Sequence, residues 1–194
     1  MSKCDFEELL QKQFSNDPQK VLAKYNYNSG ENIFARIEAF DKSDFAEFKS
    51  IINEITLWKI NRQVFIDEQG MNALCILKSI SSPEEALGTC QAQVKKCLTV
   101  LLKTQGAKLA VASAFMHFFN PKVFPIFDQR AYRVIYKGDY KGSASVEKQA
   151  ELYFDYLKKC IEYYRDVLNE KIPFSELDKY LYQIDKEMGN QTNW

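Results

Sequence analysis

Apolar residues recur at intervals of three and four along nearly the whole of this sequence, rather than at intervals of two. That periodicity places apolar side chains on one face of successive α-helices. Helix breakers are few, because the 194 positions hold only seven glycines and five prolines. With 46% hydrophobic residues, the chain is also long enough to bury a substantial core. The sequence therefore predicts an all-α protein, with residues 1–194 forming one compact unit.

Capping residues, glycines and prolines divide this pattern into segments. The clearest start signal is Ser82-Pro83-Glu84-Glu85, because Ser82 can cap a helix, Pro83 suits the first helical position and Glu85 completes a capping box. Helices are expected over about residues 5–14, 44–64, 71–80, 83–105, 109–119, 129–136, 146–172 and 176–188.

Composition and charge exclude several classes of protein. The longest apolar run, residues 110–119, is shorter than the roughly 20 residues that cross a bilayer, so no membrane span is expected. The N-terminus turns acidic where a signal peptide would be apolar, which favours a cytoplasmic location. Five cysteines without a C-x-x-C pair, together with one histidine, predict reduced structural thiols and no metal site. Because 26 basic residues balance 26 acidic ones, any nucleic-acid-binding surface must be a local patch.

A glycine marks a turn between two of the expected helices. Gly106 can adopt the positive φ that a tight turn needs. The helix after it is apolar all round and rich in small residues, so we expect it to be buried and closely packed. Its first N–H groups lack partners within the helix and would form a phosphate-binding site. The alternative is a tight helix connection with no ligand.

This turn belongs to a longer stretch that resembles a known family. Residues 102–114 hold a leucine, the Gly106 turn and an Ala-rich helix, and residues 124–131 follow with Asp128 at an unbroken spacing. Over about residues 84–136 this arrangement resembles the helix-hairpin-helix (HhH-GPD) superfamily of base-excision DNA glycosylases. The resemblance implies two helical lobes with a cleft, DNA repair as the activity, Asp128 as the catalytic carboxylate, and a candidate monovalent-cation site at the hairpin. It also implies DNA contacts by four hairpin residues, Gly106, Ala107, Lys108 and Ala110.

A group of uncharacterised bacterial proteins is similar over most of the chain. It shares a Trp-Lys-x-x-Arg motif, here Trp58, Lys59 and Arg62, an Ala-Ser-Ala helix, and a Pro-Ile-x-Asp-x-Arg-Ala segment, here residues 125–131. That similarity brings no known function. Trp58 and Arg62 lie four positions apart, on one face of a helix, and with Lys59 they are candidate nucleic-acid-binding residues. Packing of Trp58 in the core is the alternative.

Three departures from the glycosylase pattern limit the chemistry. Ala110 stands where lyase-type members carry a nucleophilic lysine, so Schiff-base chemistry through that position is excluded and monofunctional base removal is expected. Lys108 replaces the second glycine of the hairpin and would resist a positive φ by about 1–2 kcal/mol. The iron–sulfur loop of some members is absent, because nothing after Cys160 could ligate a cluster.

Asp128, Arg130 and His117 each need a structural interpretation beside a functional one. Asp128, just before a short helix, is either an ordinary N-cap or the group that stabilises a sugar cation. Arg130, in the first helical turn, needs a partner, which would be Asp128 or a bound phosphate. His117 is expected to be a hydrogen-bonded core residue rather than a general base.

The resemblance thus implies a DNA-binding protein, with monofunctional removal of a damaged or mispaired base as its candidate activity. RNA is the alternative nucleic acid, and no cofactor is expected. The competing hypothesis is a module that keeps the fold without the chemistry and binds nucleic acid or, in a defence system, another protein.

Overall fold

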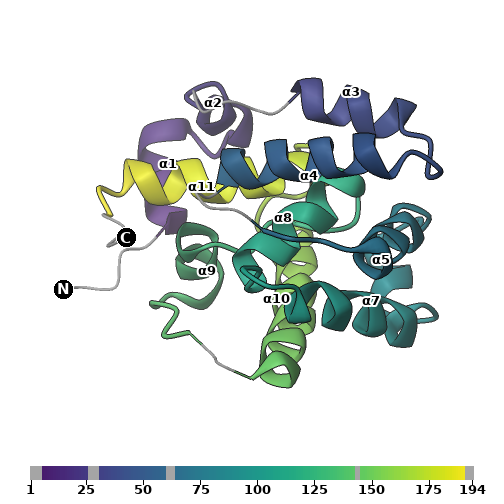
Figure 1. Cartoon of the computed structure of the whole chain (residues 1–194). Helices are drawn as coiled ribbons and strands as arrows, with labels where there is room; N and C mark the ends of the chain where they lie inside the picture. The colour runs from purple at the N-terminus through teal and green to yellow at the C-terminus, as the bar shows by residue number, and fades with distance from the viewer. Residues whose placement is uncertain (1–5, 26–30, 60–63, 143–144, 191–194) are drawn as a thin grey trace.

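The computed structural model describes residues 6–25, 31–59, 64–142 and 145–190, and within these ranges the chain is helical without a β-strand (Figure 1). The all-α class predicted from the apolar periodicity is confirmed. The first half of the chain holds α1 (Phe6–Phe14), α2 (Pro18–Leu22), α3 (Glu31–Ala39), α4 (Phe45–Lys59), α5 (Glu68–Lys78) and α6 (Pro83–Leu87). The second half holds α7 (Gln91–Lys103), α8 (Leu109–Phe119), α9 (Gln129–Tyr136), α10 (Val146–Asp166), a 3-10 turn (Phe174–Glu176) and α11 (Leu177–Glu187).

Helix α8 is the centre of the structure. All of its residues except Ala110 are buried. It packs against α3, α4, α5, α7 and α10. The small side chains of Ala112, Ser113 and Ala114 allow these neighbours to approach closely. The prediction of a buried, closely packed helix after the Gly106 turn is therefore confirmed.

A second set of helices gathers around α11, drawn in yellow in Figure 1. Helix α11 packs against α1, α2 and α9, while α10 contacts α6, α7 and α8 as well as α9. We call α3, α4, α5, α7 and α8 the α8 group, and α1, α2, α9 and α11 the α11 group. One continuous cluster of buried side chains extends through both groups, from Phe6 in α1 to Ile184 in α11.

The helix that follows Ser82 is shorter than expected. Ser82 caps α6 as predicted, because its hydroxyl accepts the N–H of Glu85 at 3.2 Å. The Glu85 carboxylate in turn accepts the N–H of Ser81 at 2.7 Å. The expected helix over residues 83–105 is nevertheless two helices, because Gly88 adopts φ −108° and ψ −107°, which lies outside the helical region. The capping signal was interpreted correctly, and the glycine that ends the short helix was overlooked.

Several further helix boundaries differ from the prediction. Helix α10 ends at Asp166 rather than at about residue 172, and α5 begins at Glu68 rather than at about residue 71. Helix α4 ends at Lys59, whereas a helix to about residue 64 was expected; residues 60–63 lie outside the described residues, and Val64 is already non-helical. Val64 and Ile66 are buried on either side of the exposed Phe65, which is the alternation of an extended segment. At the other end of the chain, the 3-10 turn precedes α11, which begins one residue later than expected.

The described cysteines, Cys75, Cys90, Cys97 and Cys160, are all free thiols. Burial raises the pKa of Cys160, which keeps its thiol protonated and unreactive. Cys4 lies outside the described residues. None of the described helices combines the length and the apolar character needed to cross a membrane.

Candidate active site and nucleic-acid interface

Asp128 caps helix α9. Its Oδ1 accepts the N–H of Ala131 at 2.8 Å, and its backbone (φ −141°, ψ 173°) is extended, as an N-cap requires. The other carboxylate oxygen, Oδ2, lies 3.7 Å from Nζ of Lys59, and the Asp128 side chain is 21% exposed. The N-cap interpretation is confirmed, and it uses only one of the two carboxylate oxygens.

Lys59 brings a positive charge to Asp128 from the end of α4. Its side chain is only 12% exposed, so the pair is largely withdrawn from water. The preceding residue, Trp58, packs edge-on against Phe118 with ring centroids 5.1 Å apart, so its indole contributes to the core. Arg62, the third residue of the Trp-Lys-x-x-Arg motif, lies outside the described residues. Of the motif residues that the structure describes, Lys59 is the one that brings a charged group to the site.

His117 and Asp178 form a second buried pair. His117 is a hydrogen-bonded core residue, as expected, with Nδ1 2.9 Å from the carbonyl oxygen of Phe124. Because a carbonyl oxygen only accepts, Nδ1 must carry the ring proton. The Nε2 atom lies 3.8 Å from Oδ1 of Asp178, a buried oxygen without a hydrogen-bond partner. When the imidazole is neutral and its proton is on Nδ1, Nε2 of His117 and Oδ1 of Asp178 are both hydrogen-bond acceptors and repel each other. A proton on Nε2 or on Oδ1 removes this repulsion.

The two pairs lie within electrostatic reach of each other. Burial raises the pKa of Asp178; electrostatic interactions with His117, Lys179 and Lys59 oppose this rise, and that with Asp128 adds to it. Lys59 belongs to α4, His117 to α8, and the two carboxylates to the cap of α9 and to α11. We call Lys59, His117, Asp128 and Asp178 the carboxylate centre, which stands where the α8 and α11 groups meet. Clusters of buried ionisable groups of this kind are typical of functional sites.

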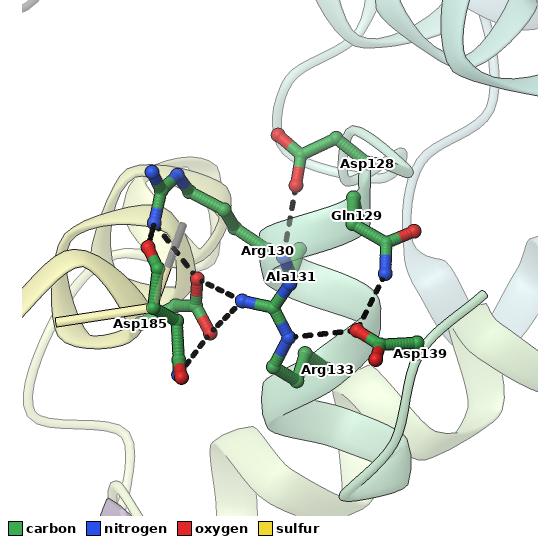
Figure 2. Close-up of polar contacts among 8 residues, drawn as sticks. Asp128, Gln129, Arg130, Ala131, Arg133, Asp139 and Asp185 are labelled. Atoms are coloured by element: carbon green, nitrogen blue, oxygen red, sulfur yellow. Dashed lines mark hydrogen bonds and ion pairs between the residues drawn. The ribbon is translucent and has the colours of Figure 1, made fainter. Parts of the chain in front are cut away.

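The two arginines after Asp128 bind a different carboxylate. Figure 2 shows Arg130 and Arg133 converging on Asp185 of α11, whose side chain is completely buried. Arg130 donates to Oδ2 at 2.9 Å, and Arg133 donates to Oδ1 at 2.9 Å and to Oδ2 at 2.8 Å. The expected partner of Arg130, Asp128 or a phosphate, is therefore corrected to Asp185, which α11 supplies because it packs along α9.

The hairpin turn between α7 and α8 has the predicted glycine conformation, with Gly106 at φ 84°. Lys108, the N-cap of α8, has φ −117° and ψ 179°, which is extended backbone, so the expected cost of a positive φ does not arise there. The N–H of Leu109 donates to Oε1 of Gln149 at 3.0 Å. This corrects the expectation for the first N–H group of α8, which has a protein partner and is not open to a phosphate.

The hairpin residues differ in exposure. Gly106 and Lys108 are exposed, Ala110 is half-buried and Ala107 is buried. A nucleic-acid backbone at this turn would therefore meet the Gly106 backbone and the Lys108 side chain first.

A groove of about 530 Å³ lies along α7 and reaches the hairpin turn. Its lining includes Lys95, Lys96 and Lys103 from α7, together with Phe65 and Asp67 from the segment before and at the start of α5. We call this hollow the α7 groove. The lysines of this groove form a local cluster of positive charge next to the hairpin, although basic and acidic residues are equal in number over the whole chain.

Sequence reasoning missed three polar residues, Asp178, Asp185 and Gln149. Their partners lie far away in the sequence, so no local motif predicted the contacts. A weak signal existed for Asp185, which stands four positions after Leu181 and so falls within the apolar stripe of its helix. An acidic residue inside such a stripe indicates a buried, paired carboxylate.

Comparison with known proteins adds no relative, since no family model, curated protein or solved structure matches the chain. In the part of the chain that the structure describes, no group of three or more His, Cys, Asp or Glu side chains could hold a metal ion.

Proposed function

We propose that this protein binds DNA and removes a base from it by monofunctional hydrolysis of the N-glycosidic bond, with Asp128 facing the sugar. The observation that carries the proposal is the position of Asp128, whose Oδ2 takes no part in the helix cap and lies 3.7 Å from Nζ of Lys59, where two groups of helices meet. In this proposal the α8 and α11 groups are the two lobes of a helix-hairpin-helix glycosylase fold. The proposal places a nucleotide turned out of the base stack beside Asp128, at the junction of these two groups.

The proposed chemistry needs one carboxylate and one water molecule. As the C1′–N bond stretches, its electron pair moves onto the departing base and positive charge develops on the sugar. The Asp128 carboxylate stabilises that charge. Water then adds to C1′ and gives a proton to Oδ2 of Asp128, which passes it to solvent, while the departing base takes up a proton from solvent. The products are a free base and an abasic sugar, and Lys59 is a positioning residue that holds the Asp128 carboxylate in place.

The hairpin side of the molecule is the proposed contact with the DNA backbone. Lys108 at the turn and Lys103 at the end of α7 are both exposed. Their ammonium groups can neutralise phosphates without reading the sequence. Arg130 and Arg133 are assigned no phosphate, because Asp185 already binds both. The same contacts would serve an RNA backbone, which makes RNA the alternative nucleic acid.

A panel of duplexes with one damaged or mispaired base each tests the enzymatic part. The duplexes are incubated with the protein, treated with alkali to break abasic sites, and resolved on a gel. The wild type is expected to release at least one base, and Asp128→Asn is expected to lower the rate on the order of a hundredfold or more. Asparagine keeps the N-cap acceptor, so the melting temperature of this variant should stay close to that of the wild type. Asp17→Asn, at the N-cap of α2, is the matched control and should leave activity unchanged.

Each of the other outcomes contradicts a defined part of the proposal. Full activity in Asp128→Asn shows that Asp128 is only a helix cap. Strand breaks before alkali, with a protein–DNA adduct trapped by borohydride, show that the enzyme is not monofunctional and implicate the amine of Lys59. DNA binding without release of any base overturns the enzymatic part and supports a non-catalytic nucleic-acid-binding module. No binding to any strand favours the protein-interaction module.

A further inference from the structure

Phe65 is a large aromatic side chain that the fold holds in the solvent. It is 66% exposed, whereas its neighbours Val64 and Ile66 are 4% and 6% exposed. The two buried neighbours anchor the extended segment on both sides and direct Phe65 outward. The side chain lies in the lining of the α7 groove, so it is exposed at a defined place rather than scattered on the surface.

The α7 groove that Phe65 enters carries more positive than negative charge. The lining contains three lysines, Lys95, Lys96 and Lys103, and one carboxylate, that of Asp67. That carboxylate is already used as the N-cap of α5, because its Oδ1 accepts the N–H of Gly70 at 2.9 Å. From Lys96 to Lys103 the helix rises by about 10 Å, so the positive charges extend along the groove and do not converge on one point.

We propose that the α7 groove binds an unpaired nucleic-acid strand, with a base stacked on Phe65 and the backbone along the three lysines. A polyanion with flat apolar faces matches both features of the groove, because bases of any sequence stack on aromatic side chains and phosphates pair with lysines. A duplex matches only the charge, since its base faces are covered by their neighbours. The inference rests on the proposed function only in taking nucleic acid as the partner, and it does not involve Asp128.

Fluorescence anisotropy with two labelled probes tests this inference. The probes are a single-stranded oligothymidine of about 12 nucleotides, within the range of single-strand site sizes, and a duplex of equal length. Phe65→Ala is expected to weaken binding of the single strand on the order of tenfold or more and to leave duplex binding nearly unchanged. Phe65→Trp should retain the affinity and show fluorescence quenching when the strand binds. The matched control is Leu57→Ala, because Leu57 is 68% exposed and lies outside the groove lining; it should bind both probes as the wild type does.

Three results would overturn the inference. The first is wild-type affinity for the single strand in Phe65→Ala, and the second is an equal loss for the duplex or in Leu57→Ala. The third is a wild type that binds the duplex and not the single strand, which leaves the proposed base removal standing. Conversely, Phe65-dependent binding of the single strand by a protein that releases no base supports this inference while overturning the enzymatic proposal.

Discussion

Replacement of Asp185 by asparagine is expected to lower the free energy of unfolding by about 3–5 kcal/mol, the range typical for removing one partner of a buried ion pair. The Asp185 side chain is completely buried, and those of Arg130 and Arg133 are 13% and 15% exposed. Four N–H bonds reach the Asp185 oxygens, one from Arg130, two from Arg133 and one from Asn190. Asparagine is similar in size but places an N–H₂ group against these donors. It leaves Arg130 without the Asp185 carboxylate and Arg133 with only the exposed Asp139.

The magnitude depends on whether Asp185 is ionised. The pKa values of Asp185 and Arg133 are both raised, which favours the neutral form of the carboxyl group and the charged form of the guanidinium. Burial raises the pKa of Asp185, and Arg133 and Arg130 oppose the rise without cancelling it. Burial also acts to lower the pKa of Arg133, but Asp139 and Asp185 more than offset this effect and the pKa is raised. We take the pair as ionised, because the four bonds at Asp185 all bring N–H donors and none offers an acceptor for a carboxyl proton.

Urea denaturation at pH 7, followed by circular dichroism, measures the loss directly. The matched control is Asp139→Asn, because Asp139 binds the same Arg133 at 3.0 Å but is 71% exposed. Exposed pairs contribute about 0–1 kcal/mol, so the control should change little. For a chain of this size, the Asp185→Asn loss corresponds to a fall in Tm of about 6–20 °C. A loss no larger than that of the control would refute the role of Asp185 as the buried contact between α9 and α11.

Three further substitutions test other parts of the structure by their effect on Tm. Gly70→Ala should cost about 1–3 kcal/mol, since a Cβ there would overlap Cγ1 of Ile66; an unchanged Tm would mean that Ile66 can move aside. Asn120→Ala should also cost about 1–3 kcal/mol, because its Nδ2 donates to two carbonyls at the end of α5 at 3.0 and 2.8 Å, and wild-type stability would contradict these bonds. Burial raises the pKa of Asp178, so the folded state holds the carboxyl proton of Asp178 more tightly than the unfolded chain does. Stability therefore falls as the pH rises above about 4, because the buried carboxyl group then has to lose that proton. Asp178→Asn should therefore raise Tm at pH 7 more than at pH 4, and the opposite order would contradict the raised pKa.

Features that depend on a few neighbouring residues could be predicted from the sequence. The caps at Ser82 and Asp128, and the positive φ of Gly106, follow from side chains and backbone preferences within one turn of the chain. The burial of α8 followed from its composition alone. Local signals can also conflict. The apolar spacing predicted one helix across Gly88, whereas the glycine ends α6 there.

Features that depend on packing could not be predicted in this way. Asp128 was expected from the sequence, but its contact with Lys59 arises because the end of α4 meets the start of α9 in space. The Asp185 partner of Arg130 likewise follows from how α9 and α11 pack, and the Gln149 contact at the hairpin from how α10 lies against α8. One sequence therefore predicts which residues carry charge near the site but not which of them meet.

The salt dependence of duplex binding tests most directly the central claim, that the hairpin side of this protein contacts the DNA backbone. The logarithm of the association constant falls linearly with the logarithm of salt concentration, with a slope set by the number of phosphates neutralised. Lys108→Glu is predicted to weaken binding and to reduce the slope by about 1. Lys12→Glu, at an exposed lysine of α1, is the control and should leave the slope of the wild type. An unchanged slope in Lys108→Glu, or an equal reduction in both variants, would contradict the account.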